Sequence, residues 1–491
     1  MEAHAHATLV DTTVGDISGQ ALAPAVLDER PTICVLALSP IADDPRVRRQ
    51  AEAFHRAGWN VIAVGLPGAR SAEPEWRVLT RDDLPAPSVV DAPADSSAAM
   101  LPGSAPSGRH APLREMYGLK DRLPCGLRRL LTFPIRLTRN ALVYCYYRTR
   151  QLLNGRIRYA LRLLGVRVRP VFAQDIYWSF SENIQHIYSV ARQEAAAVWL
   201  ANDWTMLPLA ARLARERGGV YGYDTHEFAA EEYGDQRKWR LWHRPMVCAL
   251  EQEFICGAAV VSAVSSKIAE RLQTLYRLPN PGITIRNTPP FEAVSFRPTA
   301  HDRVKVLYHG IVTPGRGLEA TIDSVAAWRP AFELTIRGPG DEGYLDGLRR
   351  RIAERGLAER IIIAPPVPMT ALVREAAAYD VGFFALPGSS RHNEFALPNK
   401  FFEYLMAGLA LCVTDLPEMA RLLREHDLGV TFPRVDPEMI AAAINDLHPA
   451  AIDRYKRNAL RAARELCWER ESERLVAAYG AALARPKPEA A

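Results

Sequence analysis

Short, continuously apolar runs alternate with amphipathic stretches along most of the chain. An unbroken apolar run of roughly four to eight residues suits a parallel strand that is buried on both faces. Such runs form two series, which predict strands at 33–39, 60–65, 197–203, 220–224, 258–265 and 282–287 and then at 304–310, 332–338, 360–366, 380–386 and 410–415. Because strands and helices alternate, each series predicts a parallel sheet with helices on both faces. The sequence therefore predicts an α/β protein with two Rossmann-like domains.

The break between the two series sets the expected domain boundaries. We expect an N-terminal Rossmann-like domain over residues 31–295 and a C-terminal one over residues 296–465, facing each other across a cleft. A chain of 491 residues is long enough for each domain to bury its own core. Residues 1–30 precede the first apolar run and are expected to form a flexible tail.

Two segments of the N-terminal domain depart from this alternation. Residues 84–112 are rich in Pro, Ala and Ser and are expected to form a disordered linker. Residues 116–170 are expected to form a basic amphipathic insertion, because Asp121 is the one acid among many arginines at 120–169. A helical wheel of this insertion places one set of apolar residues on a single arc, namely Leu153, Ile157, Ala160, Leu161 and Leu164.

A basic helix with an apolar arc suits an anionic membrane surface, so we expect residues 120–169 to contact one. An alternative is a helix that packs on its own domain and leaves its arginines in solvent. RNA is a third alternative, but no sequence signature of an RNA-binding fold accompanies the charge. No nucleic-acid partner is therefore expected.

Cysteine usage and hydropathy bear on the compartment. The seven cysteines are scattered and form no C-x-x-C pair, which favours a reducing compartment and argues against structural zinc. The N-terminal residues show no signal-peptide pattern, and no run of about 18 apolar residues could span a bilayer. We expect a cytoplasmic protein that is peripheral on the inner face of the membrane.

The segment 396–408 carries the strongest chemical signal. It indicates a loop, then Pro398 at the first helical position, then a helix that ends at Gly408. The N-terminus of such a helix favours an anion. Lys400 and Glu403 lie three residues apart, near one face, and offer a cation for phosphate and a carboxylate for a diol. A sugar nucleotide needs both groups, although an ordinary ion pair between the two residues would also explain the spacing.

Two glycine-rich turns follow strands of the second series. The turn at 309–317 contains Gly310 and lacks the Walker A ending. The turn at 338–343 begins at Gly338 and satisfies G-x-G-x-x-G, with Glu359 loosely where a ribose-binding acid would lie. This second turn leaves a nicotinamide dinucleotide open as an alternative ligand, although a lone fingerprint is a weak signal.

Polar residues also follow strands of the first series. Asp44 and Arg46 lie in the first strand-to-helix loop, Asp203 ends the strand at 197–203, and His226 follows the strand at 220–224. Ligands of open α/β sheets bind at the carboxyl ends of strands, so these residues are candidates for a site. Helix capping by the aspartates and a local role for His226 are the structural alternatives. No D-x-D pair occurs, so no metal site is expected.

Taken together, several blocks resemble the family 4 retaining glycosyltransferases, which have the two-domain GT-B fold. The matching blocks are 43–65, 200–214, 223–233, 261–272, 307–325 and 396–408. The resemblance implies the GT-B fold and a C-terminal helix, expected at 466–485, that returns to the N-terminal domain. It implies transfer of a sugar, with retention, from a UDP- or GDP-sugar substrate and without a cofactor. The N-terminal domain would bind the acceptor and the C-terminal domain the sugar nucleotide.

The same resemblance assigns residue roles. Those implied in catalysis are His226, Arg316 and Lys400. Those implied in donor binding are Glu403, Glu394, Phe395, Ala396, Leu397, Gly310 and Gly338. Those implied on the acceptor side are Asp44, Arg46 and Asp203. The chain departs from the family twice, because Ile311 replaces the first of two basic residues and Phe395 stands where the first of two glutamates is expected, with Glu394 one place away.

The predicted activity is therefore that of a metal-independent hexosyltransferase. The basic insertion favours a lipid-linked or polysaccharide acceptor, as in the biosynthesis of cell-envelope polysaccharide. Two alternatives remain open. A sugar-nucleotide epimerase of the same fold would release a free product without any acceptor. A non-catalytic scaffold on the membrane would keep the fold and bind no nucleotide.

Overall fold

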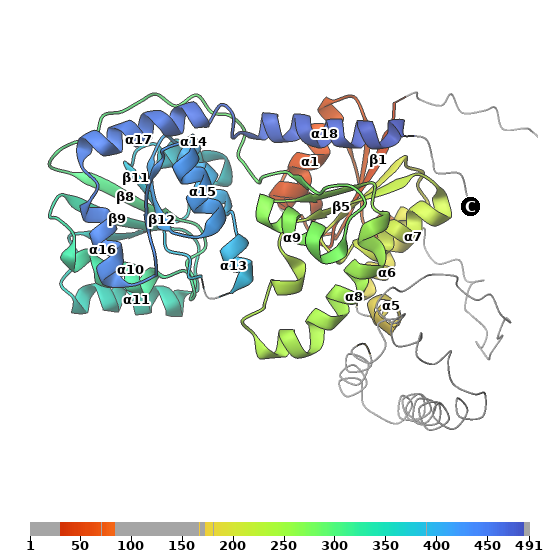
Figure 1. Ribbon diagram of the computed structural model, residues 1–491, viewed down its shortest axis with the longest axis horizontal. Coiled ribbons are helices and arrows are strands. Elements are labelled where there is room, and N and C mark those ends of the chain that lie inside the picture. Colours follow the sequence, from red (N-terminus) through yellow and green to blue (C-terminus); the bar gives the residue numbers. More distant parts are fainter. Residues whose placement is uncertain are drawn as a thin grey trace, which may run out of the picture.

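Two parallel sheets organise the chain in a computed structural model that describes residues 30–69, 71–83, 166, 172–179, 181–388 and 390–485. The two sheets form two α/β domains that lie side by side (Figure 1). The α/β class predicted from the sequence is confirmed. The expected tail, the linker at 84–112 and the basic insertion at 116–170 lie outside the described residues, apart from Arg30 and Val166.

The N-terminal sheet has seven parallel strands in the order β3-β2-β1-β4-β5-β6-β7. Its strands are β1 (Thr32–Leu36), β2 (Asn60–Val64), β3 (Arg77–Leu79), β4 (Val198–Asn202), β5 (Val220–Thr225), β6 (Val260–Ala263) and β7 (Ile283–Thr284). The helices of this domain are α1 (Pro45–Arg56), α5 (Phe172–Trp178), α6 (Glu182–Ala191), α7 (Leu207–Arg217), α8 (Arg244–Phe254) and α9 (Ser266–Tyr276). The central strands β1 and β4 are almost wholly buried, as their apolar runs predict.

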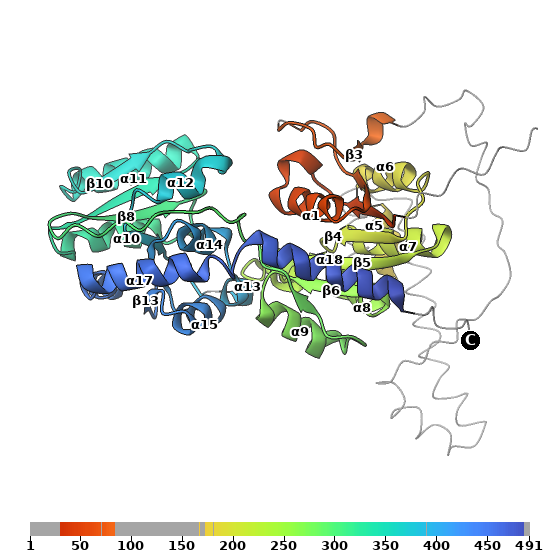
Figure 2. The ribbon, with the colours of Figure 1, turned by 90° about the horizontal axis from the view of Figure 1, so that it is seen from above.

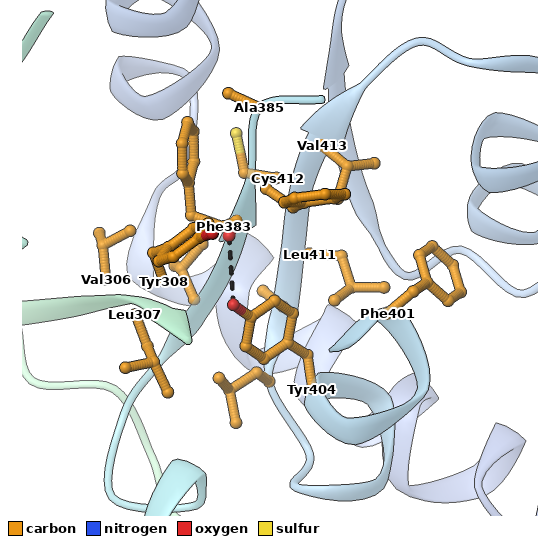
Figure 3. Close-up of a cluster of buried hydrophobic side chains, with 14 of the residues drawn as sticks. Val306, Leu307, Tyr308, Phe383, Ala385, Phe401, Tyr404, Leu411, Cys412 and Val413 are labelled. Atoms are coloured by element: carbon orange, nitrogen blue, oxygen red, sulfur yellow. Dashed lines mark hydrogen bonds between the residues drawn. The ribbon is translucent and has the colours of Figure 1, made fainter. Parts of the chain in front are cut away.

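The C-terminal sheet has six parallel strands in the order β10-β9-β8-β11-β12-β13. Its strands are β8 (Val304–His309), β9 (Phe332–Arg337), β10 (Ile361–Ala364), β11 (Val381–Phe384), β12 (Ala410–Thr414) and β13 (Gly429–Phe432). Its helices are α10 (Leu318–Ser324), α11 (Glu342–Glu354), α12 (Leu372–Ala376), α13 (Arg391–Phe395), α14 (Asn399–Met406), α15 (Pro417–Glu425), α16 (Pro437–Asn445) and α17 (Pro449–Ala462). The resulting core contains Tyr404, whose buried hydroxyl donates to the carbonyl of Phe383 at 3.2 Å (Figure 3).

Short turns of other helical types complete the fold. Turns of 3₁₀ helix lie at Ile41–Asp43, Arg81–Asp83, Ala229–Glu231, Ile255–Gly257, Val325–Ala327 and Met369–Ala371, and a π-helical turn lies at Trp239–His243. Within the described ranges, no helix combines the length and the apolar character needed to cross a bilayer.

The last helix, α18 (Trp468–Ala484), leaves the C-terminal domain and packs against α1 of the N-terminal domain, as seen from above in Figure 2. The ring of Tyr479 meets that of Phe54 edge to face, with centroids 5.5 Å apart. Gly222 on β5 makes room for this packing, because a Cβ there would lie 1.9 Å from the Tyr479 hydroxyl oxygen. The chain therefore crosses between the domains a second time, and α18 buries its apolar face on the first domain.

Both sheets reverse their strand order at one point, between β1 and β4 in the first domain and between β8 and β11 in the second. Loops that leave the carboxyl ends of strands diverge at such a point and leave a crevice, where ligands of open α/β sheets bind. The loops after β1, β5, β8 and β9 bring residues of both domains to one cleft.

Candidate functional site

The cleft between the domains has a volume of about 650 Å³, within the range of small-molecule sites. Most of the candidate residues line it, namely Asp44, Arg46, His226, Gly310, Arg316, Gly338, Ala396, Leu397, Lys400 and Glu403. Asp203, Glu394 and Phe395 are not among its lining residues. The fold thus brings ten candidate residues that are far apart in the sequence to one cleft, and the other three lie outside its lining.

The start of α14 forms part of the C-terminal wall of the cleft. Pro398 was expected at the first helical position, but it is the N-cap, with extended angles of φ −72° and ψ 149°. The helix begins one residue later, at Asn399, because the preceding residue must leave the helical region for the chain to enter from a loop. Gly408 follows the helix at φ +70°, the left-handed conformation that glycine adopts without strain.

Lys400 reaches the cleft over two aromatic rings. Its Nζ lies 4.1 Å from the ring centroid of Phe384 and 4.7 Å from that of Tyr308. Burial, and then the charge of Arg316, lower the pKa of Lys400 to about 7, against an opposing effect of Glu403. Gly310 leaves space for this ammonium group, since a Cβ there would lie 2.9 Å from Nζ. A cation held in this way is stabilised by any anion that enters the cleft.

Glu403, one turn further along α14, faces β8. Its Oε2 lies 2.7 Å from Nε2 of His309, a residue that is only 2% exposed. The backbone N–H of His309 donates to the Tyr404 hydroxyl at 2.8 Å, and the two rings stack with centroids 4.6 Å apart. In the described part of the chain Lys400 makes no ion pair with Glu403, so the simple pair considered from the sequence does not form.

Arg316 lies on the same wall, in the loop that precedes α10. Glu319, a carboxylate three residues further along the chain, accepts a hydrogen bond from the Tyr344 hydroxyl at 2.7 Å. Among the described residues, no ion pair or hydrogen bond is recorded for Arg316. Ile311, which stands at the other basic position of the family, is 61% exposed at the cleft. Arg316 and Lys400 are therefore cations without a carboxylate partner.

The two glycine-rich turns hold each other. The N–H of Gly310 donates to the carbonyl of Arg337 at 3.0 Å, and that of Val312 donates to Pro339 at 2.8 Å. A Cβ at Gly338 would lie 1.8 Å from the carbonyl oxygen of Gly310, so glycine is required for this contact. In this structure the G-x-G-x-x-G turn at 338–343 therefore packs against the turn at 309–317. Glu359 is exposed just before β10, at the opposite end of the sheet from the cleft, which removes its suggested role with a dinucleotide.

The N-terminal wall is built around the carboxylate of Asp224, at the end of β5. Arg46 donates to it from both Nε and Nη2 at 2.7 Å, and Gln50 donates from Nε2 at 2.8 Å. Asp44 caps α1 by accepting from the N–H groups of Arg46 and Val47. Asp224 is fully buried, and the neighbouring guanidinium lowers its pKa although burial acts in the other direction. The pair fixes the first strand-to-helix loop against β5.

His226 stands next to this pair and carries a proton. Its Nε2 lies 3.0 Å from the Asn202 side-chain oxygen and 3.4 Å from Asp224, and its Nδ1 lies 3.5 Å from Asp203. Burial alone would lower the pKa of His226, but the Asp203 and Asp224 carboxylates raise it to about 9. Asp203 holds φ +64° and does not cap α7, which begins at Leu207, so it acts on the histidine. His226 is therefore cationic at neutral pH, and it is already paired.

Comparisons with known proteins agree with this arrangement. Residues 303–449 match a family model described as glycosyl transferases group 1. The match spans most of the C-terminal domain, which is thus similar to group 1 glycosyltransferase domains. A D-inositol 3-phosphate glycosyltransferase of Jonesia denitrificans is 23% identical over 257 residues, which cover 47% of this chain. The chain spans 58% of the length of that curated relative.

Solved structures show the fold of the whole chain. A sucrose-phosphate synthase from Thermosynechococcus elongatus has a TM-score of 0.61 at 13% identity, covering 93% of this chain and 100% of that one. HepE from Anabaena, solved with UDP and glucose, has a TM-score of 0.55 at 12% identity, covering 92% of this chain and 100% of that one. The predicted GT-B fold is confirmed, and the group 1 glycosyl transferase match lies in its second half.

Phe395 lies at the contact between the C-terminal and N-terminal domains, and Glu394 precedes it on α13. The Phe395 carbonyl accepts from the Ser265 hydroxyl at 2.9 Å, and its ring meets that of Phe228 at 6.0 Å. Glu394 lies beside it on α13 and is not among the lining residues of the cleft. The short helix α13 turns Phe395 toward the domain contact, and neither residue lines the cleft, so their roles in donor binding stay predictions.

Four functional candidates were not singled out from the sequence, namely Asp224, Glu227, His309 and His392. Glu227 and His392 line the cleft from opposite domains, with the Glu227 carboxylate 3.7 Å from His392 Nε2. Burial, and then the charges of Asp203 and Glu232, raise the pKa of Glu227 to about 7. A usable signal was present for the first three, because Asp224 and His309 are polar residues at the ends of apolar strands and Glu227 follows one of those ends by two residues.

Proposed function

We propose that the protein is a retaining hexosyltransferase that moves a sugar from a nucleoside-diphosphate sugar, UDP- or GDP-linked, to an acceptor hydroxyl. The observation that carries this proposal is the C-terminal wall of the cleft. Two unpaired cations, Arg316 and Lys400, lie beside the N-terminus of α14, with the Glu403 carboxylate one turn away. The two cations and the helix N-terminus suit a diphosphate, and the carboxylate suits the diol of a ribose.

The proposed chemistry uses these fixed charges when the glycosidic bond breaks. Negative charge grows on the departing diphosphate, and Arg316, Lys400 and the end of α14 stabilise it. The phosphate in turn raises the lowered pKa of Lys400, so its proton is retained. The anomeric carbon becomes oxocarbenium-like, and the acceptor hydroxyl attacks from the face that the diphosphate leaves, while its proton passes to an oxygen of the departing diphosphate. His226, a cation on the opposite wall, positions the sugar.

We propose that this reaction does not depend on a bound divalent metal. The chain has no D-x-D pair, and the proposed charge stabilisation comes from side chains and a helix end. Activity should persist in EDTA. A rate that falls in EDTA and returns with manganese would contradict this part of the proposal.

We also propose a lipid-linked or polysaccharide acceptor, reached at an anionic membrane surface through residues 120–169. The support is the arginine-rich amphipathic sequence of that segment, which lies outside the described residues. The full chain should co-sediment with vesicles of anionic lipid, less so as salt rises, because the Debye length at 0.15 M is only about 8 Å. Equal sedimentation of a variant without 120–169 would contradict it.

The function is tested by incubating the protein with UDP-, GDP- and ADP-sugars and measuring the nucleoside diphosphate released. Release of one nucleotide is expected, and Glu403→Ala should abolish it. The thermal unfolding midpoint should fall modestly, because the buried Nε2 of His309 loses its carboxylate partner at a cost of about 1–3 kcal/mol, but the protein should stay folded. Formation of a free epimeric sugar without acceptor would indicate an epimerase instead. No nucleotide binding at all would indicate a scaffold. An unchanged rate in Glu403→Ala would contradict its proposed role at the ribose.

A further inference from the structure

One carboxylate on the N-terminal wall of the cleft is left without a hydrogen bond. Glu227 lines the cleft with 45% of its side chain exposed, and its carboxylate lies 3.7 Å from Nε2 of His392, across the cleft. Burial and then the charge of Arg316 lower the pKa of His392, which favours the neutral imidazole. Within the described ranges, no hydrogen bond to the Glu227 carboxylate oxygens is recorded. A carboxylate of this kind accepts hydrogen bonds from ligand donors, and its two oxygens match the spacing of neighbouring hydroxyls.

An unpartnered donor lies on the same wall. The Arg46 side chain is 3% exposed, and its Nε and Nη2 are used by Asp224. Its Nη1 is buried without a hydrogen-bond partner, and Arg46 lines the cleft. A buried donor left without a partner costs about 1–3 kcal/mol, so this N–H favours a ligand oxygen at that point.

The charges on this wall favour a neutral ligand. Arg46 is neutralised by Asp224, and His226 is neutralised by Asp224 and Asp203. Asp44 and Glu227 add acidic oxygens to the cleft, and Glu232 lies close enough to act on the Glu227 charge. A phosphate placed here would face carboxylates, and Arg46 and His226, the cations that line this wall in the described residues, already have carboxylate partners. A hydroxyl, in contrast, can donate to Glu227 and accept from Arg46.

We propose that Arg46 and Glu227 form the acceptor subsite and bind a neutral sugar ring, with two ring hydroxyls donating to Glu227 and one ring oxygen accepting from Arg46 Nη1. This inference rests on the proposed function and names the class of its acceptor. A lipid-linked or polysaccharide acceptor would present such a ring at its growing end and keep its phosphates, if any, away from this wall.

The test measures binding directly, so it does not depend on finding the natural acceptor. Saturation-transfer NMR on the full chain is run with methyl glycosides of glucose, galactose and mannose, and with the 1-phosphates of the same sugars, each with and without UDP or GDP. With UDP or GDP bound on the C-terminal wall, at least one methyl glycoside should bind, and the sugar 1-phosphates should bind more weakly. Without nucleotide the 1-phosphates can also bind at Arg316 and Lys400, so that arm does not test the acceptor subsite. Glu227→Ala should weaken glycoside binding by about tenfold or more, the loss expected for a charged hydrogen bond.

Matched variants separate this role from a general loss of structure. Glu227→Gln, which keeps one acceptor oxygen, should retain part of the glycoside binding. Glu270→Ala removes an exposed carboxylate of the same domain on α9, outside the cleft, and should leave glycoside binding unchanged. In Glu227→Ala the nucleotide affinity should stay within about twofold, because the nucleotide is placed on the other wall.

Three results would overturn the inference. With UDP or GDP bound, they are tighter binding of the sugar phosphates than of the glycosides, equal glycoside binding by Glu227→Ala and the parent, and no glycoside binding at about 10 mM. Failure of the proposed function gives a different result, because the nucleotides would then not bind in calorimetry whatever the glycosides do.

Discussion

The two walls of the cleft carry cations in two different states. On the C-terminal wall Lys400 rests on the rings of Phe384 and Tyr308, and Arg316 has no carboxylate partner in the described part of the chain. On the N-terminal wall Arg46 makes two hydrogen bonds to Asp224, and His226 lies between Asp203 and Asp224. Both walls come from loops at the carboxyl ends of parallel strands. The partners of the cations, not their number, therefore decide which ligand each wall suits.

The pKa values of one residue on each wall show the physical difference. Burial and then repulsion from Arg316 lower the pKa of Lys400 to about 7, and the opposing effect of the Glu403 carboxylate is smaller than these two. Burial also acts on His226, but two carboxylates raise its pKa to about 9. A bound anion would stabilise the charged form of Lys400, which lacks a close partner. It would gain little from His226, whose charge is already balanced by two carboxylates. The C-terminal wall is thus suited to a diphosphate and the N-terminal wall to hydroxyl groups.

The largest expected effect concerns the paired wall. Arg46→Ala leaves Asp224 buried without the guanidinium that makes two hydrogen bonds to it, with only His226 as a neighbouring cation at 3.4 Å, which costs up to about 3–5 kcal/mol of unfolding free energy. Arg56→Ala is a matched control, because Arg56 lies on the same helix and is 72% exposed beside Glu52. That variant should lose less than about 1 kcal/mol. Urea unfolding of both variants measures the difference. Equal stabilities would show that the Arg46–Asp224 pair does not hold this wall together.

The next effect concerns the unpaired wall. Arg316→Ala and Lys400→Ala should each weaken nucleoside-diphosphate binding, since a charged hydrogen bond contributes about 1.5–3 kcal/mol, or roughly tenfold or more in affinity. Calorimetry provides the dissociation constants. Arg349→Ala, on the exposed face of α11, serves as the control and should bind as the parent does. A parent-like affinity in the Arg316 and Lys400 variants would place the phosphates elsewhere.

The pH dependence of nucleoside-diphosphate binding tests whether Lys400 on the C-terminal wall takes up a proton when a phosphate binds. In the free protein Lys400 loses its proton above about pH 7, and a bound phosphate raises its pKa. Affinity should therefore be flat below pH 7 and fall above it, by at most about tenfold per pH unit. Lys400→Arg keeps its charge at all these pH values, so its affinity should not fall in this way. A parent profile as flat as that of Lys400→Arg would show that Lys400 does not exchange a proton on binding.

The smallest expected effect is a shift in the pKa of His226. Asp203→Asn removes a carboxylate that lies 3.5 Å from His226 Nδ1, so the pKa of His226 should fall below that of the parent. The imidazole resonances in an NMR titration report the midpoint. Asp346→Asn, on α11 of the other domain, should leave it unchanged. An unshifted midpoint in Asp203→Asn would mean that Asp224 alone keeps His226 protonated.

The fold could be predicted from the sequence because buried parallel strands consist of unbroken apolar runs. Cys34 on β1 is flanked by Ile62 and Trp199, and each of these lies in a run of its own. The site was accessible only where its residues form a local pattern, as Lys400 and Glu403 do. The Arg46–Asp224 pair joins positions 178 residues apart, and no local spacing indicates such a pair. Pro398 was misplaced by one residue because helix ends depend on backbone angles that the sequence does not specify.

The most direct test of the central contrast is calorimetry of UDP, GDP and ADP against three proteins. These are the parent chain, the double variant Arg316→Ala/Lys400→Ala and Glu227→Ala. If the C-terminal wall holds the diphosphate, one nucleotide binds the parent and Glu227→Ala alike, and it binds the double variant about 100-fold more weakly or worse, if the two single losses add. Parent-like binding by the double variant, or an equal loss in Glu227→Ala, would contradict the assignment of the two walls.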